Sequence, residues 1–281
     1  MRVLSSHRVP FANARSATTA PPASWLDVRP ASVTAKLKAA FYGNLISPRE
    51  RYARVVRRAL RSGPLLDLGC GRDAPFLASC GADVLKVGID RLVRDGSGHD
   101  LLNGDVTEIP LRNNSVEVAC CRSVLEHLTD PKAFFAEVKR ILRPGGTFVG
   151  LTPNRFDYVS VAASLVPNRL HGRVVASLTE RPEEQTFPTF YRANTARALR
   201  ASAAHAGLSL VSVRYLRAHP HYLQFSPLTY ALGVLVEQVV ERRVRPVRPW
   251  LLVVLVKEPS VMAPVETRAR GVARPFSGAR L

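Results

Sequence analysis

A glycine turn after an apolar run is the part of this sequence best suited to binding a charged small molecule. Gly69 and Gly71 follow residues 64–68, an apolar run that holds one acid, Asp67. Glycine permits a tight turn and a close approach of ligand to backbone, and the helix pattern that follows offers N–H groups and a positive dipole end. The spacing Gly69-x-Gly71-x-x-Ala74 also fits the relaxed dinucleotide fingerprint. Alone, the turn indicates a nucleotide-bearing cofactor without identifying it.

Acidic residues close the next two segments. Residues 84–90 form an apolar strand pattern that ends on Asp90, about twenty residues past the first glycine, where a carboxylate can accept from both ribose hydroxyls. Asp105 lies at another strand end, in segment 100–111, where it could accept from the exocyclic amine of adenine. These two carboxylates predict an adenosine-bearing ligand at the carboxyl ends of the strands.

One histidine stands where a reacting group would be. The strand pattern 116–121 leads directly into segment 122–128, which contains His127. Open α/β folds bind their ligands at this edge, and imidazole is the most frequent general base, so His127 is the candidate base for a hydroxyl acceptor. A packing or hydrogen-bonding role beside the cofactor fits the same position. Weaker candidates are Glu126 as a base and, as substrate contacts, His171, Tyr191, His219 and His221.

The surrounding pattern alternates strands and helices. Apolar residues recur at helical spacing over 131–142, and Arg143-Pro144-Gly145-Gly146 is expected to stop that helix before a fifth strand at 147–152. Later elements are a helix over 196–206 closed by Gly207, strands at 208–215 and 250–256, and a helix over 227–240. This order predicts an α/β fold with a doubly wound, Rossmann-like sheet.

The order of motifs resembles the class I S-adenosylmethionine-dependent methyltransferases, in particular their small-molecule, type 11-like branch. The motifs are LDLGCG at 66–71, GD at 104–105 followed by IPL at 109–111, LEHL at 125–128 and LRPGG at 142–146. The match covers roughly residues 64–153. The resemblance implies a seven-stranded, mostly parallel sheet with an antiparallel last strand, a lid inserted after strand five, and S-adenosyl-L-methionine as the cofactor.

The resemblance also implies roles for individual residues. Asp67 would hold the methionine end of the cofactor, with the backbone of the glycine turn against it, while Asp90 takes the ribose and Asp105 the adenine. The full cofactor set is Asp67, Gly69, Cys70, Gly71, Asp90, Asp105 and Val106. One departure is Asp73, where the family often has a third glycine, and it adds a negative charge near the turn.

The chain divides into a core domain and appendages. We expect a disordered basic tail at 1–26, for which an organelle transit peptide is the alternative, then a helical segment at 27–62 across the cofactor mouth. The methyltransferase domain would span 63–257, with a lid at about 153–191 that packs on the core or meets a lipid surface, and 258–281 would form a second tail. The helix over 227–240 carries an apolar face that is expected to pack on the fold or on a second subunit, with a lipid as the less favoured contact; its members are Leu228, Leu232, Leu235 and Val239.

Composition limits the compartment and the partners. The four cysteines show neither a zinc-ligand nor a disulfide pattern, so we expect no metal and a reducing, cytoplasmic location. No apolar run approaches the roughly eighteen residues of a membrane span. Forty Lys and Arg against 22 acids give a net charge of +18, for which an anionic partner and an arginine-rich composition common to the whole proteome are equally good explanations. Nucleic acid is disfavoured, because strand four is not followed by the Asp/Asn-Pro-Pro-aromatic motif, no Pro-Cys pair is present and no RNA-binding module is appended.

These observations predict methyl transfer from S-adenosyl-L-methionine to a small-molecule acceptor, anionic or lipid-like, at a hydroxyl oxygen. Peripheral membrane contact stays open, and the sequence does not set the oligomeric state. The alternatives are a nucleic-acid methyltransferase, a nicotinamide-dependent oxidoreductase, and a non-catalytic protein that binds the cofactor with the same fold.

Overall fold

A computed structural model describes residues 32–81, 83–93, 100–157, 187–220, 223, 226–241 and 243–259. The expected tail 1–26, nearly all of the expected tail 258–281 and most of the insertion 153–191 lie outside these residues, as do His171 and His221.

One seven-stranded sheet carries the described part of the chain, in the order β3-β2-β1-β4-β5-β7-β6. Strands β1 to β5 pair in parallel, whereas β7 runs antiparallel to both β5 and β6. This confirms the predicted sheet. The strands are β1 Leu65–Leu68, β2 Lys86–Asp90, β3 Asp100–Asn103, β4 Val116–Arg122, β5 Leu142–Pro153, β6 Ser209–Leu216 and β7 Trp250–Val256.

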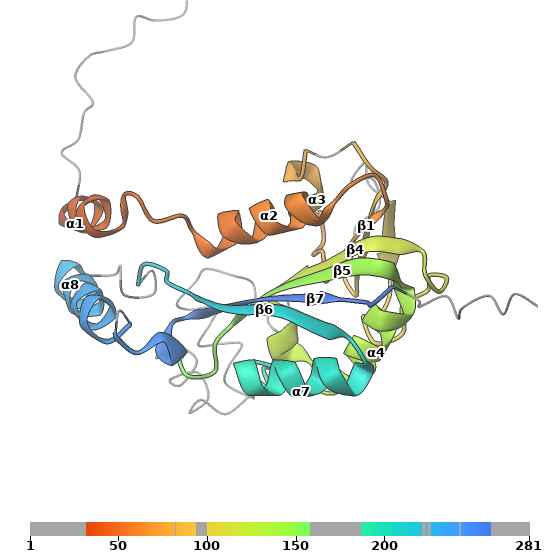
Figure 1. The fold of residues 1–281 in the computed structure, drawn as a ribbon. Coiled ribbons are helices and arrows are strands. Elements are labelled where there is room, and N and C mark those ends of the chain that lie inside the picture. Colours follow the sequence, from red (N-terminus) through yellow and green to blue (C-terminus); the bar gives the residue numbers. More distant parts are fainter. Residues whose placement is uncertain are drawn as a thin grey trace, which may run out of the picture.

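Helices cover both faces of the sheet (Figure 1). Helices α2 and α3 lie on one face, α4 and α7 pack together on the other, and α1 and α8 contact each other beyond one end of the strands (Figure 1). The helices are α1 Val33–Tyr42, α2 Pro48–Ala59, α3 Pro75–Ser79, α4 Pro131–Ile141, α7 Ala196–Ala206 and α8 Pro227–Val236. Between α4 and the sheet, the rings of Phe134, Phe135 and Phe148 meet edge to face with centroids 5.2–5.9 Å apart.

The structure adds local detail to one expected element and corrects another. The expected helical segment 27–62 contains two helices in its described part, because Ser47 accepts a hydrogen bond from the Glu50 N–H and Pro48 starts α2. The expected start of strand five at residue 147 was wrong, since β5 begins at Leu142, which pairs with Val116. The α4 helix still ends where expected.

The apolar face of the helix at 227–240 corrects a further expectation. Leu228, Leu232, Leu235 and Val239 are 79%, 60%, 59% and 50% exposed. They therefore do not pack on the fold, because the opposite face of α8, with Tyr230 and Val234, makes the contacts to α1.

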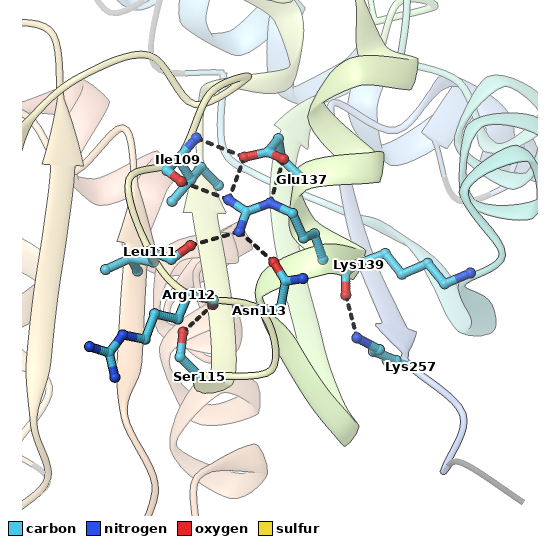
Figure 2. Close-up of polar contacts among 9 residues, drawn as sticks. Ile109, Leu111, Arg112, Asn113, Ser115, Glu137, Lys139 and Lys257 are labelled. Atoms are coloured by element: carbon cyan, nitrogen blue, oxygen red, sulfur yellow. Dashed lines mark hydrogen bonds and ion pairs between the residues drawn. The ribbon is translucent and has the colours of Figure 1, made fainter.

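A guanidinium on α4 anchors the loop that follows β3. Arg140 donates to the carbonyl oxygens of Ile109 and Leu111, to Asn113 Oδ1 and to the carboxylate of Glu137, at 2.6–2.9 Å. Figure 2 shows these acceptors gathered around one side chain, with Glu137 also accepting from the Ile109 N–H. The same loop, which begins at Gly104, carries Asp105, one of the predicted site residues, so Arg140 anchors the loop a few residues beyond it.

Replacing Arg140 by alanine is expected to lower the free energy of unfolding by about 2 kcal/mol, because a partly buried carboxylate and two loop carbonyls lose a charged donor. Urea unfolding measures the loss. Lys132→Ala, which removes an exposed cation from the same helix, is the control and should change stability little. Equal stability of the two variants would contradict the anchoring role.

Candidate active site

A cavity of about 870 Å³ opens at the carboxyl ends of the parallel strands. Its wall includes Gly69 after β1, Asp90 at the end of β2, Asp105 after β3 and His127 after β4. Residues of α1 and of the link to α2 also line it, among them Tyr42 and Ser47. The predicted position of segment 27–62 across the cavity mouth stays a prediction, although its residues Tyr42 and Ser47 line the cavity.

The glycine turn has the backbone that its sequence requires. Gly69 and Gly71 have φ values of 70° and 75°, in the left-handed region that favours glycine. A Cβ on Gly69 would lie 2.3 Å from Val124 Cγ2, so no other residue fits there without displacement of that neighbour. The Gly71 N–H donates to Asp90 Oδ2 at 2.9 Å, and the Leu92 N–H donates to Asp90 Oδ1 at 3.0 Å. Asp90 therefore holds the turn and also borders the cavity.

Asp105 is held as a carboxylate by neighbours from two loops. Its Oδ1 accepts from the Thr107 N–H at 2.9 Å and the Thr107 hydroxyl at 2.8 Å, and its Oδ2 accepts from the Arg91 guanidinium. Partial burial favours the neutral acid, but the hydrogen bonds from Arg91 and Thr107 outweigh it and lower the pKa of Asp105. Gly104 and Val106 line the cavity on either side.

Two predicted cofactor residues lie one layer behind the cavity wall. Asp67 and Cys70 are 4% and 5% exposed, and the described wall includes neither of them nor Gly71. The Cys120 thiol donates to Asp67 Oδ1 at 3.7 Å. Burial raises the pKa of Asp67 to about 7, although Arg122 opposes the shift. The predicted contact of Asp67 with the methionine end of the cofactor stays a prediction.

His127 borders the cavity, and one hydrogen bond determines which of its ring nitrogens carries the hydrogen. Its Nδ1 lies 2.9 Å from the Pro188 carbonyl oxygen, and its ring meets Phe187 edge to face at 6.0 Å. A carbonyl oxygen only accepts, so Nδ1 carries the hydrogen and Nε2 is the nitrogen that can take up a proton. Nε2 is 4.0 Å from Glu126 Oε1.

Glu126 belongs to a buried polar network behind His127. Its Oε2 accepts from the Thr152 hydroxyl at 3.0 Å, and Thr152 Oγ1 accepts from Asn194 Nδ2 at 2.6 Å. Burial raises the pKa of Glu126, and the nearby His127 works against that shift. The backbone carbonyl of Glu126 also accepts from the Tyr191 N–H at 3.2 Å. Thr152 and Asn194 were not predicted from the sequence.

The far wall of the cavity is a second polar cluster that sequence reasoning missed. The Tyr42 hydroxyl donates to Glu237 Oε2 at 2.5 Å, and burial raises the pKa of Glu237 to about 7. His219 and Tyr191, both predicted substrate contacts, also line the cavity. Tyr42 and Glu237 are 195 positions apart, so no local spacing could have linked them.

The described residues were also expected to lack a metal site, a disulfide and a membrane span. The described residues contain no group of three His, Cys, Asp or Glu side chains arranged to hold a metal ion. All four cysteines are buried thiols without a disulfide. Among the helices that the structure describes, none combines the length and the apolar composition needed to cross a bilayer.

Comparison with known proteins assigns the central part of the chain. Residues 66–150 match the model of a methyltransferase domain. A protein of Mycolicibacterium smegmatis, described as a probable S-adenosylmethionine-dependent methyltransferase, is 36% identical over 127 residues, which are 42% of this chain and 48% of that protein. The ubiquinone biosynthesis O-methyltransferase of Cereibacter sphaeroides is 31% identical over 102 residues, 32% of this chain and 41% of the relative. The chain thus spans about half or less of these curated relatives.

A solved structure gives a more distant likeness. The S-adenosylmethionine-dependent methyltransferase of Thermotoga maritima has 15% sequence identity and a TM-score of 0.49, over 79% of this chain and 95% of that one. The fold assignment rests on the strand order and directions described above.

Proposed function

We propose that this chain, whose residues 66–150 form a methyltransferase domain of the class I S-adenosylmethionine-dependent kind, methylates a hydroxyl oxygen of a small-molecule or lipid-like acceptor. The observation that carries the proposal is a single cavity with the glycine turn and Asp90 on one wall and His127 on another. The name of the Cereibacter relative, a ubiquinone biosynthesis O-methyltransferase, supports an oxygen acceptor.

The residues at the turn fit the cofactor. Gly69 leaves bare backbone at the cavity wall, and each Asp90 oxygen keeps a lone pair for a ribose hydroxyl after bonding the turn. Asp105 would accept from the adenine amine, with Val106 beside the ring. When bound, the sulfonium of this cofactor supplies an electrophilic methyl group.

His127 would serve as the base. Its Nε2 accepts the proton of the acceptor hydroxyl, while Nδ1 stays bonded to the Pro188 carbonyl, which fixes the plane of the ring. Glu126, 4.0 Å from Nε2, would stabilise the resulting imidazolium. The remaining contribution is alignment of acceptor and methyl group, which can supply up to roughly 7–11 kcal/mol.

The cofactor assignment predicts a loss of affinity in Asp90→Ala. Removing the carboxylate deletes the acceptors for both ribose hydroxyls and frees the Gly71 N–H, so affinity for S-adenosylmethionine should fall roughly tenfold to a hundredfold. Calorimetry measures the change.

Asp73→Asn is the matched control, because this exposed acid lies in the same turn region and should leave affinity unchanged. Nicotinamide dinucleotides should not bind the parent protein. Unchanged affinity in a folded Asp90→Ala variant would remove this residue from the cofactor site, and transfer of labelled methyl into RNA or DNA in place of small molecules would overturn the acceptor class.

A further inference from the structure

Helix α8 presents an apolar stripe to solvent. Leu228, Leu232 and Leu235 recur on α8 at spacings of four and three, so they share one face, and Val239 follows in the π-helical turn Glu237–Glu241. Each of these four side chains, the α8 stripe, is at least half exposed. Contiguous exposed apolar surface of this kind marks an interaction site.

The helix that packs against α8 also carries exposed apolar side chains. Helix α1 packs on the other face of α8 and adds exposed Val33 and Phe41. Tyr42, the last residue of α1, and Glu237, the C-cap of α8, both line the cavity. Figure 1 shows these two helices side by side beyond one end of the strands. A surface that docks here would therefore lie beside the acceptor end of the site.

The positive charges around the stripe favour a negatively charged partner. Residues 33–42 and 227–236 contain no carboxylate, and the turn that follows α8 holds Glu237, which is buried, and Glu241. Lys36 and Lys38 on α1 are exposed, as are Arg243 and Arg245 beyond that turn, so cations outnumber carboxylates around the stripe. A second copy docked on the same face would bring these like charges together. A negatively charged lipid surface would attract them and accept the apolar side chains at the same time.

We propose that the α1–α8 pair docks this protein on an anionic lipid bilayer, with the α8 stripe in the interface and the cavity opening toward the lipid. The benefit of docking depends on the proposed function: an amphipathic acceptor held in the bilayer would enter the cavity beside Tyr42 without crossing water. Docking itself needs neither cofactor nor acceptor.

The test is co-sedimentation of the full chain with vesicles of phosphatidylcholine alone and of phosphatidylcholine with phosphatidylglycerol. We expect the parent protein to partition to the anionic vesicles, and the triple variant Leu228→Gln, Leu232→Gln, Leu235→Gln to lose at least about tenfold in partition coefficient. Lys36→Gln should lose about fivefold on anionic vesicles, since one cation near the surface contributes that much.

The matched control is Val211→Gln, which alters an apolar side chain 62% exposed on β6, away from the pair, and should partition like the parent. Unchanged S-adenosylmethionine affinity in the triple variant shows that the fold and the cofactor site are intact. Parent protein that stays in solution with anionic vesicles would overturn the proposal, as would a triple variant that still partitions. A dimer in sedimentation velocity that dissociates in the triple variant would assign the stripe to a second copy instead.

Discussion

His127→Ala is expected to slow single-turnover methyl transfer by about 10²–10⁴-fold while cofactor affinity stays within about twofold. The reason is the arrangement around the ring. Nδ1 is committed to the Pro188 carbonyl, so the basic nitrogen is Nε2, and the variant loses the acceptor for the hydroxyl proton. A residue that only packed beside the cofactor would change affinity or stability and leave the chemical step intact.

Rapid-quench measurement with labelled cofactor, together with calorimetry on the same variant, separates these outcomes. His205→Ala is the control, because His205 is exposed on α7 and outside the described cavity wall. A full single-turnover rate in folded His127→Ala would end the catalytic assignment. The cofactor proposal would survive, since it depends on Asp90 and the glycine turn.

Asp67 is expected to make the ligand-free protein less stable as pH rises. Burial raises the pKa of its carboxyl from 3.8 to about 7, so between these values the folded state keeps a proton that the unfolded state has released. Stability increases with pH only where the unfolded state binds more protons, and here the folded state binds more. The raised pKa of Asp67 contributes roughly 4 kcal/mol to the free energy of unfolding below about pH 4, and this contribution is lost as the pH rises through 7.

Urea unfolding of the parent and of Asp67→Asn at pH 4 to 8 measures this effect. The amide cannot titrate, so the free energy of unfolding of the variant, relative to that of the parent, should increase by up to roughly 4 kcal/mol from pH 4 to pH 8. Glu237, whose pKa burial also raises to about 7, acts in the same direction, and Glu237→Gln isolates its share. A constant difference between the parent and Asp67→Asn would show that Asp67 ionises in the folded state as freely as in the unfolded one.

The centre of the sheet was predictable because β1 and β2 are short apolar runs, the first followed by glycine and the second ending on an acid. Strands β1, β2 and β4 follow the expected segments, and Asp90 and His127 lie on one cavity because parallel strands end at one edge. Asp105 is also there, although it stands two residues beyond the end of β3 rather than at it.

The polar clusters of the site could not be predicted, because they depend on contacts between segments far apart in the sequence. The Tyr42–Glu237 bond joins α1 to the end of α8, and the Thr152–Asn194 bond crosses the insertion, so neither has a local pattern. The burial of Asp67 is equally hidden, because an acid within an apolar run can face either a cavity or the core. The expectation that the apolar face of 227–240 packs on the fold was wrong, because periodicity identifies an apolar face without showing what covers it. Its packing on a second subunit stays a prediction.

The strand order also has a consequence for biosynthesis. Strand β7 follows β6 in the chain but lies between β5 and β6 in the sheet, and its antiparallel ladders to both neighbours join these two strands. During translation β5 therefore emerges with one edge unpaired, and this edge stays open until residues 250–256 have been made. Over that interval of about a hundred codons the nascent chain exposes a ready template for pairing with another chain, which is a point at which a chaperone would protect it.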